Sequence, residues 1–308
     1  MKNQTPLVSI CCTAFNHEDY IRDAIESFLM QETSFPFEII IHDDASTDNT
    51  ANIIKEYEGK HPGLFVTIYQ TENQYSQGIK IWSNFFHPRI RGKYIALCEG
   101  DDYWTDPLKL QKQVELMEKF PEASMCVALN KKLFESSGEV KADTLYKGKN
   151  APLVYFEDLN QYFHTSTYLI RKNILDFILM KYPDLLFGDT ALRRLLINES
   201  PFVVLNEIVS VYRITGKGIW SSLDSEKKDI RIYNLWKAFR KHHLPERKRL
   251  YAINETTYLY KIILNDFRKR KLRDFPDKGW QFLKLMCRYD PLFFLRVFYR
   301  KFLKNKSS

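Results

Sequence analysis

The sequence of 308 residues lacks any run of about 18 consecutive apolar residues, the length that a membrane-spanning helix needs. It contains only 11 Gly and 12 Pro, which excludes collagen-like and other low-complexity proteins. No apolar stretch precedes Leu7, so we expect no secretory signal. Aromatic residues make up 15% of the chain, too many for a disordered polypeptide. The composition therefore indicates a folded globular protein.

Cysteine is scarce. There are five, an odd number, and no C-x-x-C or Cys/His cluster has the spacing of a zinc site. Four lie inside apolar, strand-like runs: Cys11, Cys12, Cys98 and Cys126. We expect reduced thiols that pack as small hydrophobic residues in a cytoplasmic protein.

Charge is unevenly distributed along the chain. Residues 1–222 carry 23 Lys+Arg and 29 Asp+Glu, a net charge of −6, whereas residues 223–308 carry 23 and 9, a net charge of +14. This asymmetry predicts two regions with different partners. We therefore expect one domain over residues 1–222 and a basic, aromatic-rich helical region over residues 223–308.

Short apolar segments alternate with helical patterns over the first 130 residues. Strands are predicted at 7–15, 37–42, 64–70, 93–98 and 123–129, and helices at 17–31, 48–59 and 107–120. This alternation predicts an α/β fold with a mostly parallel, Rossmann-like central sheet flanked by helices. Ligands of such sheets bind beyond the carboxyl ends of the strands.

Carboxylates follow two of the predicted strands. Asp43 and Asp44 come after the second strand, and Glu99, Asp101 and Asp102 come after the fourth. Carboxylates so close together repel one another unless a cation or proton offsets their charge. Mg²⁺ or Mn²⁺ would do so, because these hard cations bind one or two carboxylates together with substrate phosphates. A solvated acidic turn explains the second cluster equally well.

Two phosphate-binding motifs are absent. No G-x-G-x-x-G follows the first strand, which disfavours a nicotinamide-dependent dehydrogenase, and no G-x-x-x-x-G-K-[ST] occurs, which disfavours a P-loop nucleotidase. A phosphate-bearing ligand would need a metal bridge. A carboxylate of the Asp43–Asp44 pair could accept a hydrogen bond from a nucleobase or a ribose hydroxyl.

At this point the chain resembles a family 2 glycosyltransferase with the GT-A, or nucleotide-diphospho-sugar transferase, fold. The resemblance spans residues 6–130 and continues with lower specificity to about residue 222. Its motifs are Val8-Ser9-Ile10, Phe15-Asn16, Ala24-Ile25-Glu26-Ser27, Asp43-Asp44-Ala45-Ser46-Thr47-Asp48, Gly92-Lys93-Tyr94-Ile95 and Glu99-Gly100-Asp101-Asp102-Tyr103-Trp104. The resemblance implies a nucleotide-sugar half over residues 1–130 and an acceptor half over residues 131–222.

The resemblance also implies a role for each donor-side residue. Thr13 and Phe15 would line the nucleotide pocket, and Asp43 and Asp44 would contact uracil or ribose. Asp101 and Asp102 would hold the metal ion, Mn²⁺ or Mg²⁺. Asp101 and Arg213 would contact the nucleotide sugar. Two positions depart from the family pattern: Glu99 stands in place of the first Asp, and Thr215 in place of the His of a Y-R-x-H element.

On the acceptor side, the resemblance makes Asp189 the general base and His164 and Trp220 acceptor contacts. A carboxylate can take the proton that the acceptor hydroxyl loses as it attacks the anomeric carbon. The sequence leaves alternatives open: Asp189 as the N-cap of the helix that follows it, His164 as a rival base, and Trp220 as a buried structural residue.

The implied activity is inverting, metal-dependent transfer of a sugar from a nucleotide-diphospho-sugar, with UDP favoured by the family. The acceptor would be a glycan or a lipid-linked glycan in lipopolysaccharide, O-antigen or capsule assembly. The alternative is a catalytically inactive relative that binds a nucleotide sugar or acts as a scaffold at the membrane. The departures at Glu99 and Thr215 keep this alternative open.

The basic region has two explanations. Its last segment, 291–306, is cationic and amphipathic, which is typical of a helix lying on anionic lipid at the inner face of the plasma membrane. A helical subdomain with a solvated basic face explains it equally well. No nucleic-acid-binding motif is visible, so we expect no nucleic-acid partner.

Overall fold

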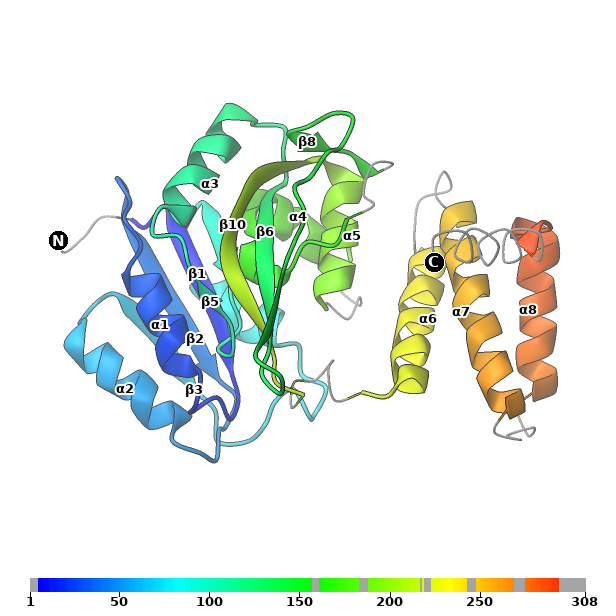
Figure 1. The fold of residues 1–308 in the computed structure, drawn as a ribbon, viewed down its shortest axis with the longest axis horizontal. Coiled ribbons are helices and arrows are strands. Elements are labelled where there is room, and N and C mark those ends of the chain that lie inside the picture. Colours follow the sequence, from blue (N-terminus) through cyan, green and yellow to red (C-terminus); the bar gives the residue numbers. More distant parts are fainter. Residues whose placement is uncertain are drawn as a thin grey trace. The chain divides into compact units, whose positions relative to one another are not determined.

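The protein is described here from a computed structural model, which describes residues 5–156, 161–182, 188–216, 218, 223–242, 248–268 and 275–293. The chain divides into two compact units, Met1–Thr215 and Gly216–Ser308 (Figure 1). The charge pattern predicts a boundary at residue 222, whereas the two units divide a few residues earlier, between Thr215 and Gly216.

The first unit is built on one sheet. Its main strands are β1 (Val8–Ala14), β2 (Phe37–Asp43), β3 (Phe65–Tyr69), β4 (Tyr94–Leu97), β5 (Tyr103–Trp104), β6 (Met125–Phe134), β9 (Leu169–Arg171) and β10 (Phe202–Ile214), in the order β3-β2-β1-β4-β9-β6-β10-β5. Two further strands lie outside this order: β7 (Glu139–Ala142) pairs with β6, and β8 (Leu153–Val154) pairs with β10. The sheet curls, as Figure 1 shows for β6 and β10.

The five strands predicted from the sequence are confirmed as β1, β2, β3, β4 and β6. The first four pair in parallel, while β9 pairs antiparallel with both β4 and β6. β6 therefore keeps the common direction but is separated from β4 by a strand from the acceptor half. The prediction of a mostly parallel sheet is confirmed, with β5, β7, β8 and β9 as the antiparallel exceptions.

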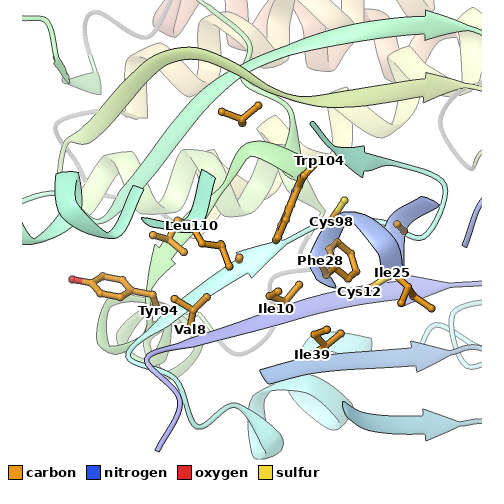
Figure 2. Close-up of a cluster of buried hydrophobic side chains, with 14 of the residues drawn as sticks. Val8, Ile10, Cys12, Ile25, Phe28, Ile39, Tyr94, Cys98, Trp104 and Leu110 are labelled. Atoms are coloured by element: carbon orange, nitrogen blue, oxygen red, sulfur yellow. The ribbon is translucent and has the colours of Figure 1, made fainter. Parts of the chain in front are cut away.

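Alternate side chains of β1 face opposite sides of the sheet. On one side, Ile10 and Cys12 join a buried cluster with residues of α1 (Ile21–Leu29), α2 (Thr50–Lys60) and α3 (Lys109–Lys119). Figure 2 shows Phe28 of α1 beside Trp104 of β5, and their ring centroids are 4.9 Å apart. On the other side lie α4 (Lys172–Lys181) and α5 (Asp189–Glu199), which follow β9 in the chain.

The cysteines behave as the sequence predicts. All five lie within the described residues and are free thiols, and Cys287 is the exposed one. Burial raises the pKa of Cys11, Cys12, Cys98 and Cys126 above the ordinary value, so these groups stay protonated and act as small apolar side chains.

The second unit consists of α6 (Ser225–His242), α7 (Lys248–Arg268) and α8 (Phe275–Tyr289). Aromatic and aliphatic side chains of these helices form its core: Tyr233, Leu259, Ile262, Phe282, Leu285 and Phe293. Inside it, the fully buried carboxylate of Glu255 pairs with Arg240. Within the described part of the chain, no helix is both long enough and apolar enough to cross a membrane. Most of the predicted lipid-binding segment, residues 294–306, lies outside the described residues.

A buried polar network joins the start of β4 to β1 and β2. The Ser9 hydroxyl donates to Glu38 Oε1 at 2.6 Å, and Arg91 donates to the same carboxylate from its amide and its guanidinium. The amide of Gly92 in turn donates to Ser9 Oγ at 2.9 Å. The backbone at Gly92 therefore runs directly against β1, where no side chain fits.

Gly92→Ala should lower the free energy of unfolding by about 1–3 kcal/mol, because the added Cβ would lie 2.6 Å from the Ser9 amide nitrogen and 2.8 Å from the Tyr94 carbonyl oxygen. As a control, Gly59→Ala in α2 adds a methyl group in open space and should raise the free energy of unfolding by about 0.5–1 kcal/mol. Urea denaturation measures both changes. An unchanged midpoint for Gly92→Ala would contradict the close approach described here.

Candidate active site

The carboxyl ends of β1, β2 and β4 meet at one edge of the sheet. The amide of Asp44 donates to the Ala14 carbonyl at 2.9 Å, and the amide of Gly100 donates to the Thr13 carbonyl at 2.9 Å. The loops that carry the predicted donor-side residues are therefore fixed to the end of β1. Their convergence follows from parallel pairing, because parallel strands bring their carboxyl ends to the same edge.

The loops after β1 and β2 are also hydrogen-bonded to each other. The Asn16 amide donates to Ser46 Oγ at 2.9 Å, and the Thr47 amide donates to Asn16 Oδ1 at 2.8 Å. Asn16 and Ala45 both have left-handed backbone conformations, with φ of 54° and 61°. Such a conformation is uncommon for Ala and persists only where surrounding contacts fix it. The two loops thus hold each other in place at the edge of the sheet.

Asp43 and Asp44 are both buried and both stabilise this edge. Asp43 accepts hydrogen bonds from the hydroxyl and the amide of Ser46, at 2.5 and 3.3 Å. Asp44 accepts the amides of Gln74 and Tyr75, at 2.8 and 3.0 Å, and so anchors the loop after β3. A carboxylate has about four acceptor sites, so these bonds leave acceptor capacity for a nucleoside.

Asp101 lies at the surface of the site. Its side chain is 18% exposed, and its Oδ2 is 4.0 Å from Nε2 of His17, which precedes α1. Burial lowers the pKa of His17, against the opposing effect of the Asp101 carboxylate. A neutral imidazole thus stands beside the carboxylate that the sequence analysis assigned to the metal and the donor.

Asp102 differs from its neighbour because its carboxylate points inward. Its side chain is 1% exposed, and Oδ1 accepts the amide of Arg213 at 2.9 Å. Burial, together with the charges of Asp101 and Glu99, raises its pKa well above the ordinary value. Asp102 therefore ties the turn after β4 to the end of β10.

The guanidinium of Arg213 also stabilises this turn. It donates to the Asp101 carbonyl at 3.2 Å, pairs with Asp23, and lies 3.3 Å from a carboxylate oxygen of Glu135. Its central carbon lies 4.4 Å from the ring centroid of Tyr103. The resemblance implies that Arg213 contacts the nucleotide sugar, whereas in this structure its donors bind the protein's own oxygens.

His164 lies next to Asp102, buried in the segment that precedes β9. Its ring stacks on Tyr212 with centroids 4.0 Å apart, and its Nδ1 lies 2.9 Å from Ser166 Oγ and 3.6 Å from Asp102 Oδ2. His164 thus connects the acceptor half to the carboxylate turn.

A pocket joins the donor and acceptor halves. It is lined at the strand ends by Thr13 and Glu99, and on the acceptor side by Thr165, Gly188 and Leu192, together with Cys11, Trp82, Leu97, Cys98, Leu175 and Leu179. Gly188 is the N-cap of α5, and the helix itself begins at Asp189. The alternative in which Asp189 is the N-cap is therefore wrong. Its backbone directly follows a residue of the pocket wall.

The two remaining predicted residues are Phe15 and Trp220. Phe15 follows the end of β1 with 42% of its surface exposed, so its ring is accessible at the edge where a nucleotide is expected. Trp220 lies outside the described residues.

The chemistry of the donor set fits a hard divalent cation. Asp101 offers an accessible carboxylate, whereas both oxygens of Asp102 face protein atoms. Within the described residues, no three His, Cys, Asp or Glu side chains are grouped so that they could hold a metal. Mg²⁺ and Mn²⁺ bind in such sites through one or two carboxylates, with substrate phosphates and water completing the shell.

Nothing in the sequence indicates a buried lysine near the site. Lys109 of α3 is fully buried, with Nζ 4.1 Å from the Trp104 ring centroid and 2.7 Å from Gln113 Oε1. Gln113 in turn donates to the Thr167 carbonyl at 2.8 Å, and Trp104 Nε1 donates to the Ser166 carbonyl at 2.8 Å. The helical pattern of residues 107–120 gave no signal for it, because lysine is ordinarily exposed.

Comparison with known proteins adds a family and several relatives. The family model described as "Glycosyl transferase family 2" matches residues 9–179, more than half of the chain. Over 121 residues, 39% of this chain and 34% of the relative, the sequence is 49% identical to the uncharacterized protein Rv1520 of Mycobacterium tuberculosis. Over 118 residues, 38% of this chain and 44% of the relative, it is 40% identical to the putative teichuronic acid biosynthesis glycosyltransferase TuaG of Bacillus subtilis. The chain spans about a third of the length of Rv1520 and less than half of the length of TuaG.

Solved structures show the same fold. S. aureus TarS 1-349 in complex with UDP-GlcNAc aligns with a TM-score of 0.65 at 19% identity, over 90% of this chain and 81% of that one. The mannosyltransferase PcManGT from Pyrobaculum calidifontis, in complex with GDP-Man and Mn²⁺, aligns with a TM-score of 0.57 at 13% identity, over 94% and 88%. These glycosyltransferase neighbours confirm the GT-A fold predicted from the sequence.

Burial lowers the pKa of Lys109 to about 7, which makes stability depend on pH. Below pH 7 the lysine is charged in both the folded and the unfolded state. Between pH 7 and about 10 the folded state has lost that proton while the unfolded state keeps it, so the free energy of unfolding should rise with pH by on the order of 1 kcal/mol per unit.

Lys109→Met should abolish this rise, whereas Lys119→Met at the exposed end of α3 should retain it. Denaturant titrations at pH 6, 7, 8 and 9 measure the slope. Equal slopes in the wild type and in Lys109→Met would mean that Lys109 is not buried as a neutral amine.

Proposed function

This chain belongs to glycosyl transferase family 2, and from that premise we propose that it transfers a sugar from a nucleotide-diphospho-sugar, with inversion, to a hydroxyl group of a glycan or lipid-linked acceptor. The observation that carries the proposal is the pocket. Donor-side residues at the ends of β1 and β4 and the N-terminus of α5 line one cavity. A donor and an acceptor bound on its two sides would meet near Asp189.

The donor would bind at the edge formed by β1, β2 and β4. Thr13 and Phe15 would contact the nucleotide, and Asp43 and Asp44 would accept its base or ribose donors with their remaining lone pairs. Because hydrogen bonds already fix this edge, binding would require little ordering of the protein. UDP-sugars are the favoured donors, in line with the UDP-GlcNAc that is bound to TarS.

Asp101 would hold the metal ion, because both oxygens of Asp102, the other residue that the resemblance assigns to the metal, face protein atoms. The Mn²⁺ in the PcManGT structure supports a divalent cation. When bound, such an ion stabilises negative charge on the leaving diphosphate. The protein's own part is to fix the position of Asp101. Two hydrogen bonds do so: the Gly100 amide donates to the Thr13 carbonyl, and the Arg213 guanidinium donates to the Asp101 carbonyl.

On the opposite side of the pocket, the Asp189 carboxylate would accept the proton of the acceptor hydroxyl as that oxygen attacks the anomeric carbon. Attack from the face opposite to the leaving group inverts the configuration. His164 and Trp220 would contact the acceptor. The relative TuaG is named for teichuronic acid biosynthesis, which supports an acceptor that belongs to surface-polymer synthesis. Lipopolysaccharide, O-antigen and capsule are such polymers.

The proposal extends to a membrane location. Residues 223–308 carry a net charge of +14, which favours contact with anionic lipid headgroups. A lipid-linked acceptor would be reached most readily from the inner face of the plasma membrane.

Calorimetric titration with UDP, GDP and TDP, with and without Mn²⁺, tests the donor site. We expect one nucleotide to bind in a metal-dependent manner, and Asp101→Ala to weaken that binding at least tenfold by removing the accessible carboxylate. Glu115→Ala, at an exposed position of α3, serves as the control and should bind as the wild type. If no nucleotide binds at millimolar concentration, the donor site is wrong and the scaffold alternative is favoured.

Asp189→Asn should reduce sugar transfer by about 10²–10⁴-fold while leaving nucleotide affinity unchanged, because only proton removal from the acceptor is lost. Transfer of radiolabelled sugar to a bacterial glycolipid extract measures the first quantity, and calorimetry the second. Wild-type transfer by this variant would exclude Asp189 as the base.

A further inference from the structure

Two arginines of the described structure are buried, Arg213 and Arg193, and their surroundings differ. Arg213 pairs with the carboxylates of Asp23 and Glu135. Arg193, in α5, is 6% exposed, and no carboxylate of the described residues pairs with it. Burying a charge without a partner is costly, so such a group marks a place where an anion would be stabilised.

The contacts of Arg193 leave one buried donor without a partner. Its Nη1 donates to the Gln161 carbonyl at 3.3 Å, and its guanidinium carbon lies 4.9 Å from the ring centroid of Tyr162. Its Nε is buried and has no hydrogen-bond partner. A guanidinium is charged at every physiological pH and has five N–H donors in a planar fork, a geometry that matches carboxylates and phosphates.

The position of Arg193 places it beside the proposed acceptor. It follows Asp189 by four residues, which is about one turn of α5. Its neighbour Leu192 lines the pocket, as does Thr165 from the segment that contains Tyr162. Tyr162 is 42% exposed, so the guanidinium lies one side chain below the surface.

We propose that Arg193, beneath Tyr162, binds an oxyanion carried by the acceptor. The oxyanion is a phosphate, as in a sugar linked through phosphate to a lipid, or the carboxylate of a uronic acid. Its identification as part of the acceptor rests on the proposed function, whereas the anion site itself does not. The bound anion would neutralise the buried guanidinium and accept from Nε, while the tyrosine ring covers the guanidinium plane.

Equilibrium binding to the full-length protein tests this proposal. The probes are inorganic phosphate, glucose 1-phosphate and glucuronate, with methyl glucoside as the neutral probe. All titrations are done with UDP and Mn²⁺ at saturation, so that the donor site is occupied. We expect the anionic probes to bind. If glucose 1-phosphate binds more tightly than glucuronate, the acceptor oxyanion is a phosphate; if glucuronate binds more tightly, it is a carboxylate.

Arg193→Gln should weaken the binding of the anionic probes at least tenfold. The matched control is Arg194→Gln, in which the neighbouring arginine of α5, packed against Phe156, is changed. It should bind the anions as the wild type does. Unchanged anion binding by Arg193→Gln, or equal losses in both variants, would overturn the proposal. Titration of the same variants with UDP shows whether the donor site is intact, so loss of anion binding can be distinguished from failure of the donor site.

A measurement on the wild type avoids any dependence on the folding of a variant. In protein labelled with ¹⁵N-arginine, the Nε–H resonance of Arg193 should shift on addition of phosphate or glucuronate and stay in place with methyl glucoside. Arg193→Lys, which keeps the charge but not the fork, assigns the resonance by its absence. A resonance that none of the anions shifts would refute the site.

Discussion

The hydrogen bond from the Arg213 amide to Asp102 is the contact on which the arrangement of the site depends. It fixes the turn after β4 to the end of β10, two segments more than 100 residues apart in sequence. The Arg213 guanidinium adds a second connection through the Asp101 carbonyl. With the inner carboxylate held in this way, Asp101 alone presents its side chain to the donor side. One of two adjacent carboxylates is thus structural and the other is available for binding.

The same division of roles occurs throughout the site. Asp43 and Asp44 use part of their acceptor capacity to hold backbone amides, and His164 stacks on Tyr212 while it approaches Asp102. Residues that resemblance assigns to ligands therefore also stabilise the edge of the sheet. Such an edge loses little conformational freedom when a nucleotide binds, but substitutions in it affect folding as well as binding.

The strands and helices of residues 7–130 could be predicted because each carries a local signal: an apolar run, or apolar residues at helical spacing. Neither the position of β9 between β4 and β6 nor the full length of β10 could be predicted. β9 has three residues and is specified by its neighbours, and β10 contains the exposed pair Asn206 and Glu207 at a bulge. Partners distant in sequence determine such elements.

The sequence by itself determined the α/β class, the carboxylates at the strand ends and the basic character of the C-terminal region, because composition, periodicity and order are local properties. Only the tertiary structure decided which carboxylate faces inward, that Arg213 bonds to protein oxygens, and that Lys109 and Arg193 are buried. Those outcomes depend on which distant segments pack together. Desolvation and hydrogen bonding there, rather than residue type, determine whether a charged group stabilises the fold or remains available for a ligand.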